Sequence, residues 1–333
     1  MSRAALAALA LLLAACAEPA YYLQALQGQA ALLNARRPVA EVEADPASSP
    51  ALRRQLARIG AAREFAVHTL DLPDNGSYRR YAALGRPAVV WTVTAAPEFS
   101  LEAQRWCFVV AGCVPYRGYF EPAAARAEAV RWHRQGFDVA VSPVPAYSSL
   151  GWFDDPLLDT FVGWPPGRVA ELIFHELAHQ KLYVAGDSAF NEAYATTVGR
   201  LGAERWLAAS GQDQALADYR TELERQRLWR ELLGELRAAL QELYASALPP
   251  AEMRARKDAL LMRSAGLLAL LGDRRGFALG NAQLALLATY EDAVPAFERL
   301  LHACGDDFAA FHRAAARIAA WPAARRAAWM RGH

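Results

Sequence analysis

Hydrophobic and polar residues follow two different spacings along the chain. Residues 17–65 are rich in Ala and Leu at helical spacing, with a break at 45–50 where Pro and Ser gather. The runs of β-branched and aromatic residues that are typical of strands are VVWTV at 89–93, CFVV at 107–110 and FDVAVSPV at 137–144. Between the last two runs, residues 123–136 are predicted to form a helix that ends at Gly136.

From about residue 165 onward the pattern is almost wholly helical. Leucines and tyrosines recur on one face of residues 213–245, and Pro249-Pro250 separates this segment from a second helical one at 251–270. A hairpin of the two segments would bury the apolar face inside a helical subdomain. An arm that binds a partner is the alternative interpretation of so long an amphipathic segment.

These elements predict an α+β fold. A small mixed or antiparallel sheet within residues 16–160 would precede a mainly helical part, residues 161–333, and the two would form one compact unit. The composition then excludes whole classes of protein. A hydrophobic fraction of 54% argues against intrinsic disorder, and 36 Lys and Arg against 35 Asp and Glu argue against a nucleic-acid-binding surface. An enzyme, a binding module and a membrane-associated protein remain.

The N-terminal segment indicates export. Arg3 precedes an unbroken Ala and Leu run at 4–15, which would span only ~18 Å as a helix, too little for the ~30 Å of a bilayer core. Residues 1–15 therefore fit a signal peptide. Leu13-Ala14-Ala15-Cys16 matches the bacterial lipobox, which predicts lipid attachment at Cys16; an ordinary signal peptide with an incidental cysteine is the alternative. Ala17 favours the outer membrane, with the chain facing the periplasm.

Export also bears on the other cysteines. Cys107 and Cys113 lie six residues apart, and in an oxidising compartment they could close a short hairpin as a disulfide. Two buried thiols are the alternative. The spacing is wrong for a CxxC zinc pair. Cys304 has no obvious partner and is expected to be buried.

The residues with the clearest chemistry are His175-Glu176-Leu177-Ala178-His179, an HExxH motif. Positions i and i+4 of a helix lie ~40° apart around its axis, so both imidazoles can bind one Zn²⁺. Glu176 points beside the metal, where it can accept a proton from metal-bound water. The apolar spacing around the motif and the preceding prolines predict a zincin-like helix at the start of the helical half.

A catalytic zinc also needs a third protein ligand. Glu192 follows His179 by 13 residues, after a turn at 184–188 in which Asp187 or Ser188 could cap a second helix. An antiparallel return of that helix would bring Glu192 over the two histidines. The resulting His₂Glu set is that of the gluzincin class, whereas the downstream histidine of a metzincin is absent.

The segment HELAHQKLYVAGDSAFNEAYATTVG, residues 175–199, resembles the motif region of the bacterial "predicted aminopeptidase" lipoprotein family of gluzincin-like zinc peptidases. Residues 113–120, 146–156 and 281–290 also resemble this family, so the resemblance covers most of the chain that follows the signal segment. It implies that His175, His179 and Glu192 hold the metal and that Glu176 is the general base. The G-x-M-E-N stretch with which zinc aminopeptidases of this clan bind the substrate amine is absent, so the residues themselves support amide hydrolysis more than aminopeptidase specificity.

The reaction also needs a donor for the developing oxyanion, commonly Tyr or His. Tyr147, just before the motif helix, and Tyr290 are candidates, with a structural role as the alternative for each. Residues 142–156 could supply an edge strand or lid for an extended substrate, or a connector packed on the core. Asp154 or Asp155 could hold a substrate ammonium. The remaining histidines stand singly and are expected at the surface or in the core.

The sequence therefore predicts a lipid-anchored zinc metallopeptidase of the bacterial cell envelope, acting on peptides and most simply an aminopeptidase. It would meet the membrane through the lipid on Cys16 and would bind no nucleic acid. Two alternatives remain: a non-catalytic envelope lipoprotein that retains a metal site, and a zinc amidase acting on a peptidoglycan peptide. The pattern predicts no oligomeric state.

Overall fold

The computed structural model describes residues 19–108, 112–146, 153–272, 279–287 and 293–332. They form two compact units, each assembled from three stretches of chain. Unit 1 holds the described residues of Met1–Arg36, Leu84–Pro145 and Ala278–Leu286, and unit 2 holds those of Arg37–Ala83, Ala146–Phe277 and Leu287–His333. The predicted signal segment 1–15, Cys16, Tyr147 and Tyr290 lie outside the described residues.

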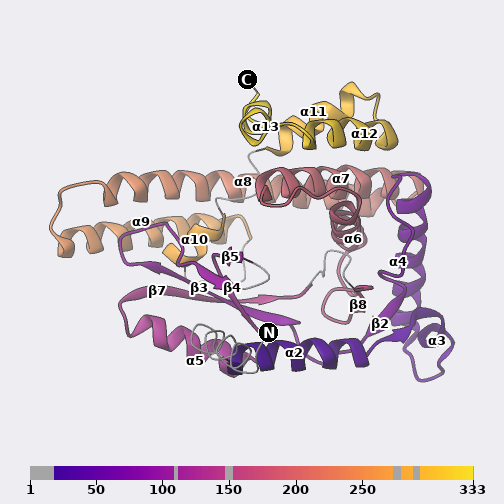
Figure 1. The fold of residues 1–333 in the computed structure, drawn as a ribbon, viewed down its shortest axis with the longest axis horizontal. Helices are drawn as coiled ribbons and strands as arrows, with labels where there is room; N and C mark the ends of the chain where they lie inside the picture. Colours follow the sequence, from indigo (N-terminus) through magenta and orange to yellow (C-terminus); the bar gives the residue numbers. More distant parts are fainter. Residues whose placement is uncertain (1–18, 109–111, 147–152, 273–278, 288–292, 333) are drawn as a thin grey trace, which may run out of the picture. The chain divides into compact units, whose positions relative to one another are not determined.

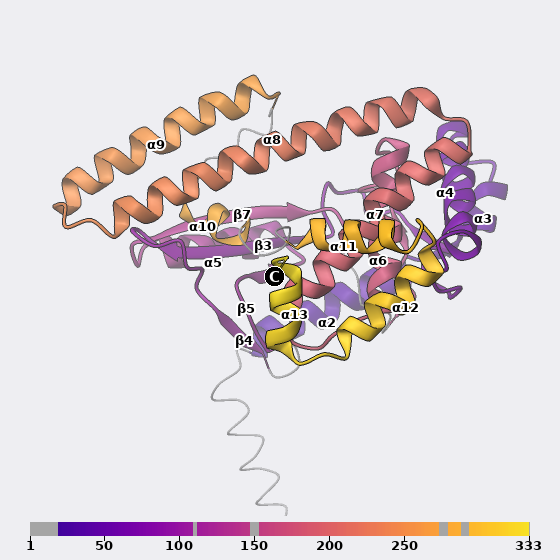
Figure 2. The same ribbon diagram turned by 90° about the horizontal axis from the view of Figure 1, so that it is seen from above.

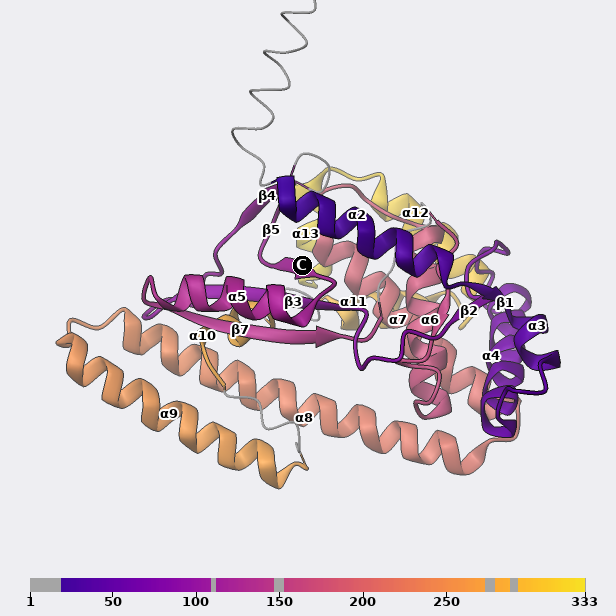
Figure 3. The ribbon, with the colours of Figure 1, turned by 90° about the horizontal axis from the view of Figure 1, so that it is seen from below.

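Unit 1 is built on an antiparallel sheet in the order β6-β3-β7. Its strands are β3 (Val90–Pro97), β6 (Arg117–Tyr119) and β7 (Phe137–Val144). The central strand β3 pairs with β7 along its whole length, from Val90 opposite Val144 to Pro97 opposite Phe137. Helix α5 (Pro122–His133) lies along this sheet and closes a small apolar core (Figure 1 and Figure 3).

Three further elements complete unit 1: α2 (Pro19–Asn34), the hairpin of β4 (Trp106–Phe108) and β5 (Gly112–Val114), and α10 (Asn281–Leu287). Helix α2 approaches the Phe120 ring so closely that a Cβ at Gly28 would lie 2.0 Å from it. Cys107 and Cys113 stand opposite each other in the hairpin and are joined by a disulfide.

Unit 2 contains a second, smaller sheet and most of the helices. Strands β1 (Arg37–Pro38), β2 (Arg80–Ala82) and β8 (Leu157–Leu158) lie in that order, β1 antiparallel and β8 parallel to β2. The helices are α3 (Val39–Ala44), α4 (Pro50–His68), α6 (Pro166–Lys181), α7 (Ser188–Ala209), α8 (Asp213–Tyr244), α9 (Pro250–Leu270), α11 (Val294–Ala303), α12 (Phe308–Ala319) and α13 (Ala323–Met330). Helices α8 and α9 pack side by side as an antiparallel hairpin (Figure 2).

The coarse α+β class is confirmed, with helices prevailing over small sheets. Strand β7 matches its predicted range, and β3 begins one residue after and extends four beyond the predicted run. The helix predicted at 123–136 ends at His133, and Gly136 follows with a positive φ of 83°. The α8–α9 hairpin is confirmed too, and Leu233, Leu236 and Leu240 of its apolar face are buried. Among the described residues, no helix combines the length and apolarity needed to cross a bilayer.

Candidate metal centre

Helix α6 carries both histidines of the motif on one face. Pro166 stands in its first turn, where the missing N–H of proline is harmless, and buried apolar residues such as Ile173 and Leu177 hold one side of the helix in the core. His175 and His179 are one turn apart. Their rings meet edge to face with centroids 4.7 Å apart, and their Nε2 atoms lie 3.0 Å from each other.

A tight turn returns the chain from α6 to α7. Gly186 takes a positive φ of 78°, and the Asp187 side chain caps α7 by accepting a hydrogen bond from the Phe190 N–H. The Asn191 side chain closes the turn, because it accepts from the Val184 N–H and donates to the Val184 carbonyl, both at 2.8 Å. This turn sets the start of α7, and with it the position of Glu192.

Close contact between α6 and α7 depends on Gly199. A Cβ at this position would lie 2.8 Å from the Glu171 carbonyl oxygen and 3.2 Å from the His175 Cβ. Any side chain here would push the two helices apart. A glycine therefore keeps α7 close enough to α6 for Glu192 to reach the histidines.

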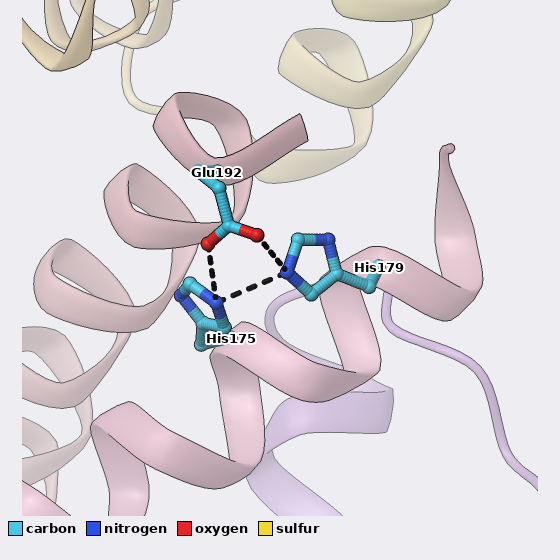
Figure 4. A group of neighbouring side chains, drawn as sticks. All are labelled: His175, His179 and Glu192. Atoms are coloured by element: carbon cyan, nitrogen blue, oxygen red, sulfur yellow. Dashed lines mark hydrogen bonds and ion pairs between the residues drawn. The ribbon is translucent and has the colours of Figure 1, made fainter. Parts of the chain in front are cut away.

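The result is a cluster of three potential ligands (Figure 4). The two Glu192 carboxylate oxygens lie 3.4 Å from the His175 Nε2 and 3.6 Å from the His179 Nε2, and the nearest donor atoms of the three residues all lie within 4.8 Å of one another. His179 is only 6% exposed. Two facing ring nitrogens and a carboxylate fit a divalent cation, and the N₂O donor set suits zinc.

Each member of the cluster has a shifted pKa. Burial lowers the pKa of His179 to about 4, with a further contribution from the neighbouring His175. Burial acts in the same direction on His175, but its bond to Glu192 and the charges of Glu176, Glu192 and Glu171 outweigh it, and the pKa of His175 is raised. Burial would raise the pKa of Glu192, yet the two histidines lower it overall. Near neutral pH, His179 and Glu192 are therefore already in the protonation states that bind a metal.

Glu176 occupies the neighbouring face of α6. It is half-buried and lies about 100° around the helix from His175. Its charge contributes to the raised pKa values of both His175 and Tyr78, so its carboxylate lies within electrostatic reach of both side chains. The Glu176 carboxylate thus lies close to the three potential ligands and is not one of them.

The opposite side of α7 is anchored by a buried hydrogen-bond chain. Tyr194, two residues past Glu192, is fully buried, and its hydroxyl lies 2.8 Å from the His312 Nδ1. The His312 Nε2 lies 2.8 Å from the Leu70 carbonyl oxygen, which can only accept. His312 therefore donates from Nε2 and accepts from the Tyr194 O–H at Nδ1. This chain fixes the rotation of α7 behind Glu192.

We expect this histidine to make the protein less stable in acid. Burial lowers the pKa of His312 in the folded chain, so below its unfolded pKa of ~6.5 only the unfolded chain takes up the proton. The free energy of unfolding then falls by up to about 1.4 kcal/mol per pH unit until the folded pKa is reached. Replacing His312→Gln removes this loss, so the stability gap between wild type and variant narrows from pH 7 to pH 5. Urea unfolding of the metal-free chain measures the gap; a constant gap would refute the assignment.

The other candidates from the sequence do not belong to the cluster of His175, His179 and Glu192. The disulfide of Cys107 and Cys113 belongs to unit 1. Asp154 is exposed, and Asp155 is buried with its backbone bonded to the loop before β2. Of the remaining histidines that the structure describes, His68, His133 and His302 are exposed and His312 is buried.

Sequence reasoning missed Asn191 and Gly199. Asn191 directly precedes Glu192, and a glycine inside a helix, seven residues after Glu192, is the available signal for a close helix approach.

A family model described as "Putative aminopeptidase" matches residues 20–330 of the chain. No match was found among curated proteins or among solved structures.

Proposed function

The chain belongs to the "Putative aminopeptidase" family, and on that premise we propose that it is a zinc-dependent aminopeptidase. His175, His179 and Glu192 hold the metal. The observation that carries this proposal is the convergence of their donor atoms within 4.8 Å, at a site where Glu176 stands beside the first ligand. A purely structural metal site has no need of that additional carboxylate.

The site residues divide the chemistry between them. When bound, zinc lowers the pKa of a water ligand towards ~7 and polarises the scissile carbonyl. Glu176 takes the proton of the attacking water and delivers it to the amine that leaves. Glu192 and His179 need no proton change to bind the metal, because burial and the neighbouring His175 keep His179 neutral while the two histidines keep Glu192 ionised. His175 has the raised pKa and must be neutral to bind.

The proposal extends to the location of the protein. Residues 1–15 act as a signal peptide, and Cys16 carries the lipid that holds the chain to the bacterial envelope, facing the periplasm. The support is the sequence of the lipobox. Two or more acyl chains on one residue anchor a protein firmly without any spanning helix.

A peptide panel tests the activity. We expect the full chain, purified in detergent and loaded with zinc, to hydrolyse peptides that have a free N-terminus. N-acetylated versions of the same peptides should react at least about 100-fold more slowly, since a site that binds the α-ammonium is left with unpaired polar groups by an amide. Release of the N-terminal residue is measured by mass spectrometry.

The possible results separate the alternatives. Equal cleavage of free and acetylated peptides would refute aminopeptidase action and leave a zinc amide hydrolase. Cleavage of peptidoglycan stem peptides alone would favour the amidase. Zinc binding without turnover of any substrate would leave a non-catalytic envelope protein with a metal site.

A further inference from the structure

A single buried arginine organises the loop that precedes β2. Arg63 of α4 is only 2% exposed, and its guanidinium donates hydrogen bonds to the Ser77 carbonyl at 2.9 Å, the Asp74 carboxylate at 3.1 Å and the Asn75 carbonyl. A rigid, planar donor that binds three residues of one loop fixes its path. We call residues 74–78 the Arg63 loop.

The Arg63 loop is bonded to the motif helix. The Asn75 side chain donates to the Gln180 Oε1 at 2.6 Å, and the Gln180 Nε2 donates to the Ser77 Oγ at 3.4 Å. Gln180 follows Glu176 by four residues on α6, so both side chains lie on the same face of the helix. The Arg63 loop therefore runs along the face that carries Glu176, next to the face that carries the two histidines.

The loop ends at Tyr78, whose backbone is strained. Tyr78 has a φ of +62°, a conformation that bulky residues rarely adopt and that persists only where the surroundings impose it. Here the Tyr78 N–H donates to the Asp155 carbonyl at 2.6 Å. Gly76 allows the close approach of the neighbouring segment, since a Cβ there would lie 2.3 Å from the Asp154 carboxylate.

Tyr78 carries a buried phenol whose surroundings include Glu176. Tyr78 is 6% exposed, and burial, together with the charges of Glu176 and Asp155, holds the pKa of its hydroxyl well above the usual range. The group stays protonated and lies within electrostatic reach of the Glu176 carboxylate. Within the part of the chain that the structure describes, no hydrogen-bond partner is found for this hydroxyl. It is a preorganised donor available to another molecule.

We propose that Tyr78 is a catalytic residue that donates its O–H to the substrate oxygen on which negative charge develops when the scissile carbonyl is attacked. This inference rests on the proposed peptidase function and adds its missing donor. Tyr183 is the rival in the described part of the chain, because its ring centroid lies 6.5 Å from that of His179. Tyr183 is 53% exposed, however, and lacks the fixed surroundings that make such a donor effective.

Three tyrosine variants of the full, zinc-loaded chain test the proposal. We expect Tyr78→Phe to lower kcat about 10²–10³-fold with little change in KM, because the lost bond forms mainly in the transition state. The zinc content and the melting temperature should stay close to wild type. Tyr81→Phe is the matched control for a buried tyrosine nearby on β2, and Tyr183→Phe tests the rival; both should retain wild-type kcat.

A binding measurement gives a readout that does not depend on turnover. A phosphinate dipeptide, which mimics the tetrahedral state, should bind Tyr78→Phe about 100-fold more weakly than wild type, while the dipeptide product binds both equally. If the wild type is active and Tyr78→Phe keeps the wild-type kcat, this inference is wrong while the proposed function stands. Loss of kcat in Tyr183→Phe instead, or loss of zinc together with kcat in Tyr78→Phe, also overturns this inference. An inactive wild type would refute both the proposed function and this inference.

Discussion

Replacing Glu176→Gln is expected to reduce kcat/KM by on the order of 10³-fold or more while leaving the zinc content unchanged. Glutamine keeps the size and shape of the side chain but cannot take up the proton of the attacking water. Glu176 is not one of the three residues whose donor atoms converge, so its neutralisation removes no ligand. Steady-state kinetics on a free-N-terminus peptide and metal analysis of the same sample measure the two quantities.

Two further variants make this result specific. Glu235→Gln removes the same charge from an exposed position on α8 and should retain full activity. Glu176→Asp keeps the carboxylate but shortens its reach, so it should retain more activity than Glu176→Gln. A Glu176→Gln chain that keeps more than about a tenth of wild-type kcat/KM would rule out Glu176 as the general base.

The centre of the candidate site could be predicted because its residues lie close together in sequence. The i, i+4 spacing of His175 and His179 follows from helix geometry alone. Only a short turn and the start of the next helix separate Glu192 from His179, and the glycine and aspartate before Glu192 mark that turn. Strand β7 could be predicted for a similar reason, since its local pattern already decides its structure.

The Arg63 loop could not be predicted, because its bonds join residues far apart in sequence. Asn75 and Gln180 are separated by 105 positions, and nothing in the local pattern of either marks the other. Arg63 looks like any basic residue of an amphipathic helix until its burial is known. The short strands β1 and β8 could not be predicted either. Two residues have no detectable alternation, and each strand depends on its pairing with β2.

The same contrast applies to the two units. Each is assembled from three stretches that interleave along the chain, whereas a change in local pattern can mark only a boundary between consecutive segments. Long-range packing brings Tyr78 beside the motif helix, whereas local geometry brings the histidines together. The proposed ligands are thus visible in the sequence, and the proposed donor becomes visible only in the fold.

Replacing His179→Leu is expected to weaken zinc binding by more than about 100-fold, since the loss of an outer partner of a ligand alone often costs 10–100-fold. Wild type should retain about one zinc per chain after dialysis, and the variant should retain almost none. His302→Leu removes an exposed histidine, bonded to Asp306, and should bind zinc as wild type does. Retention of zinc by the His179→Leu chain would exclude His179 as a ligand.

In the metal-free chain, His179→Leu should leave the stability against unfolding unchanged or raise it. Without a metal, the His179 Nδ1 is buried with no hydrogen-bond partner in the described structure, and its Nε2 faces that of His175 at 3.0 Å. Burying an unpaired polar nitrogen costs about 1–3 kcal/mol, and leucine fills similar space without that cost. Metal-free His179→Leu should therefore unfold at the same urea concentration as wild type or a higher one. Zinc at 100 times its Kd should add about 2.7 kcal/mol to wild type and nothing to the variant. A variant that is less stable than metal-free wild type would mean that His179 serves the core more than the metal.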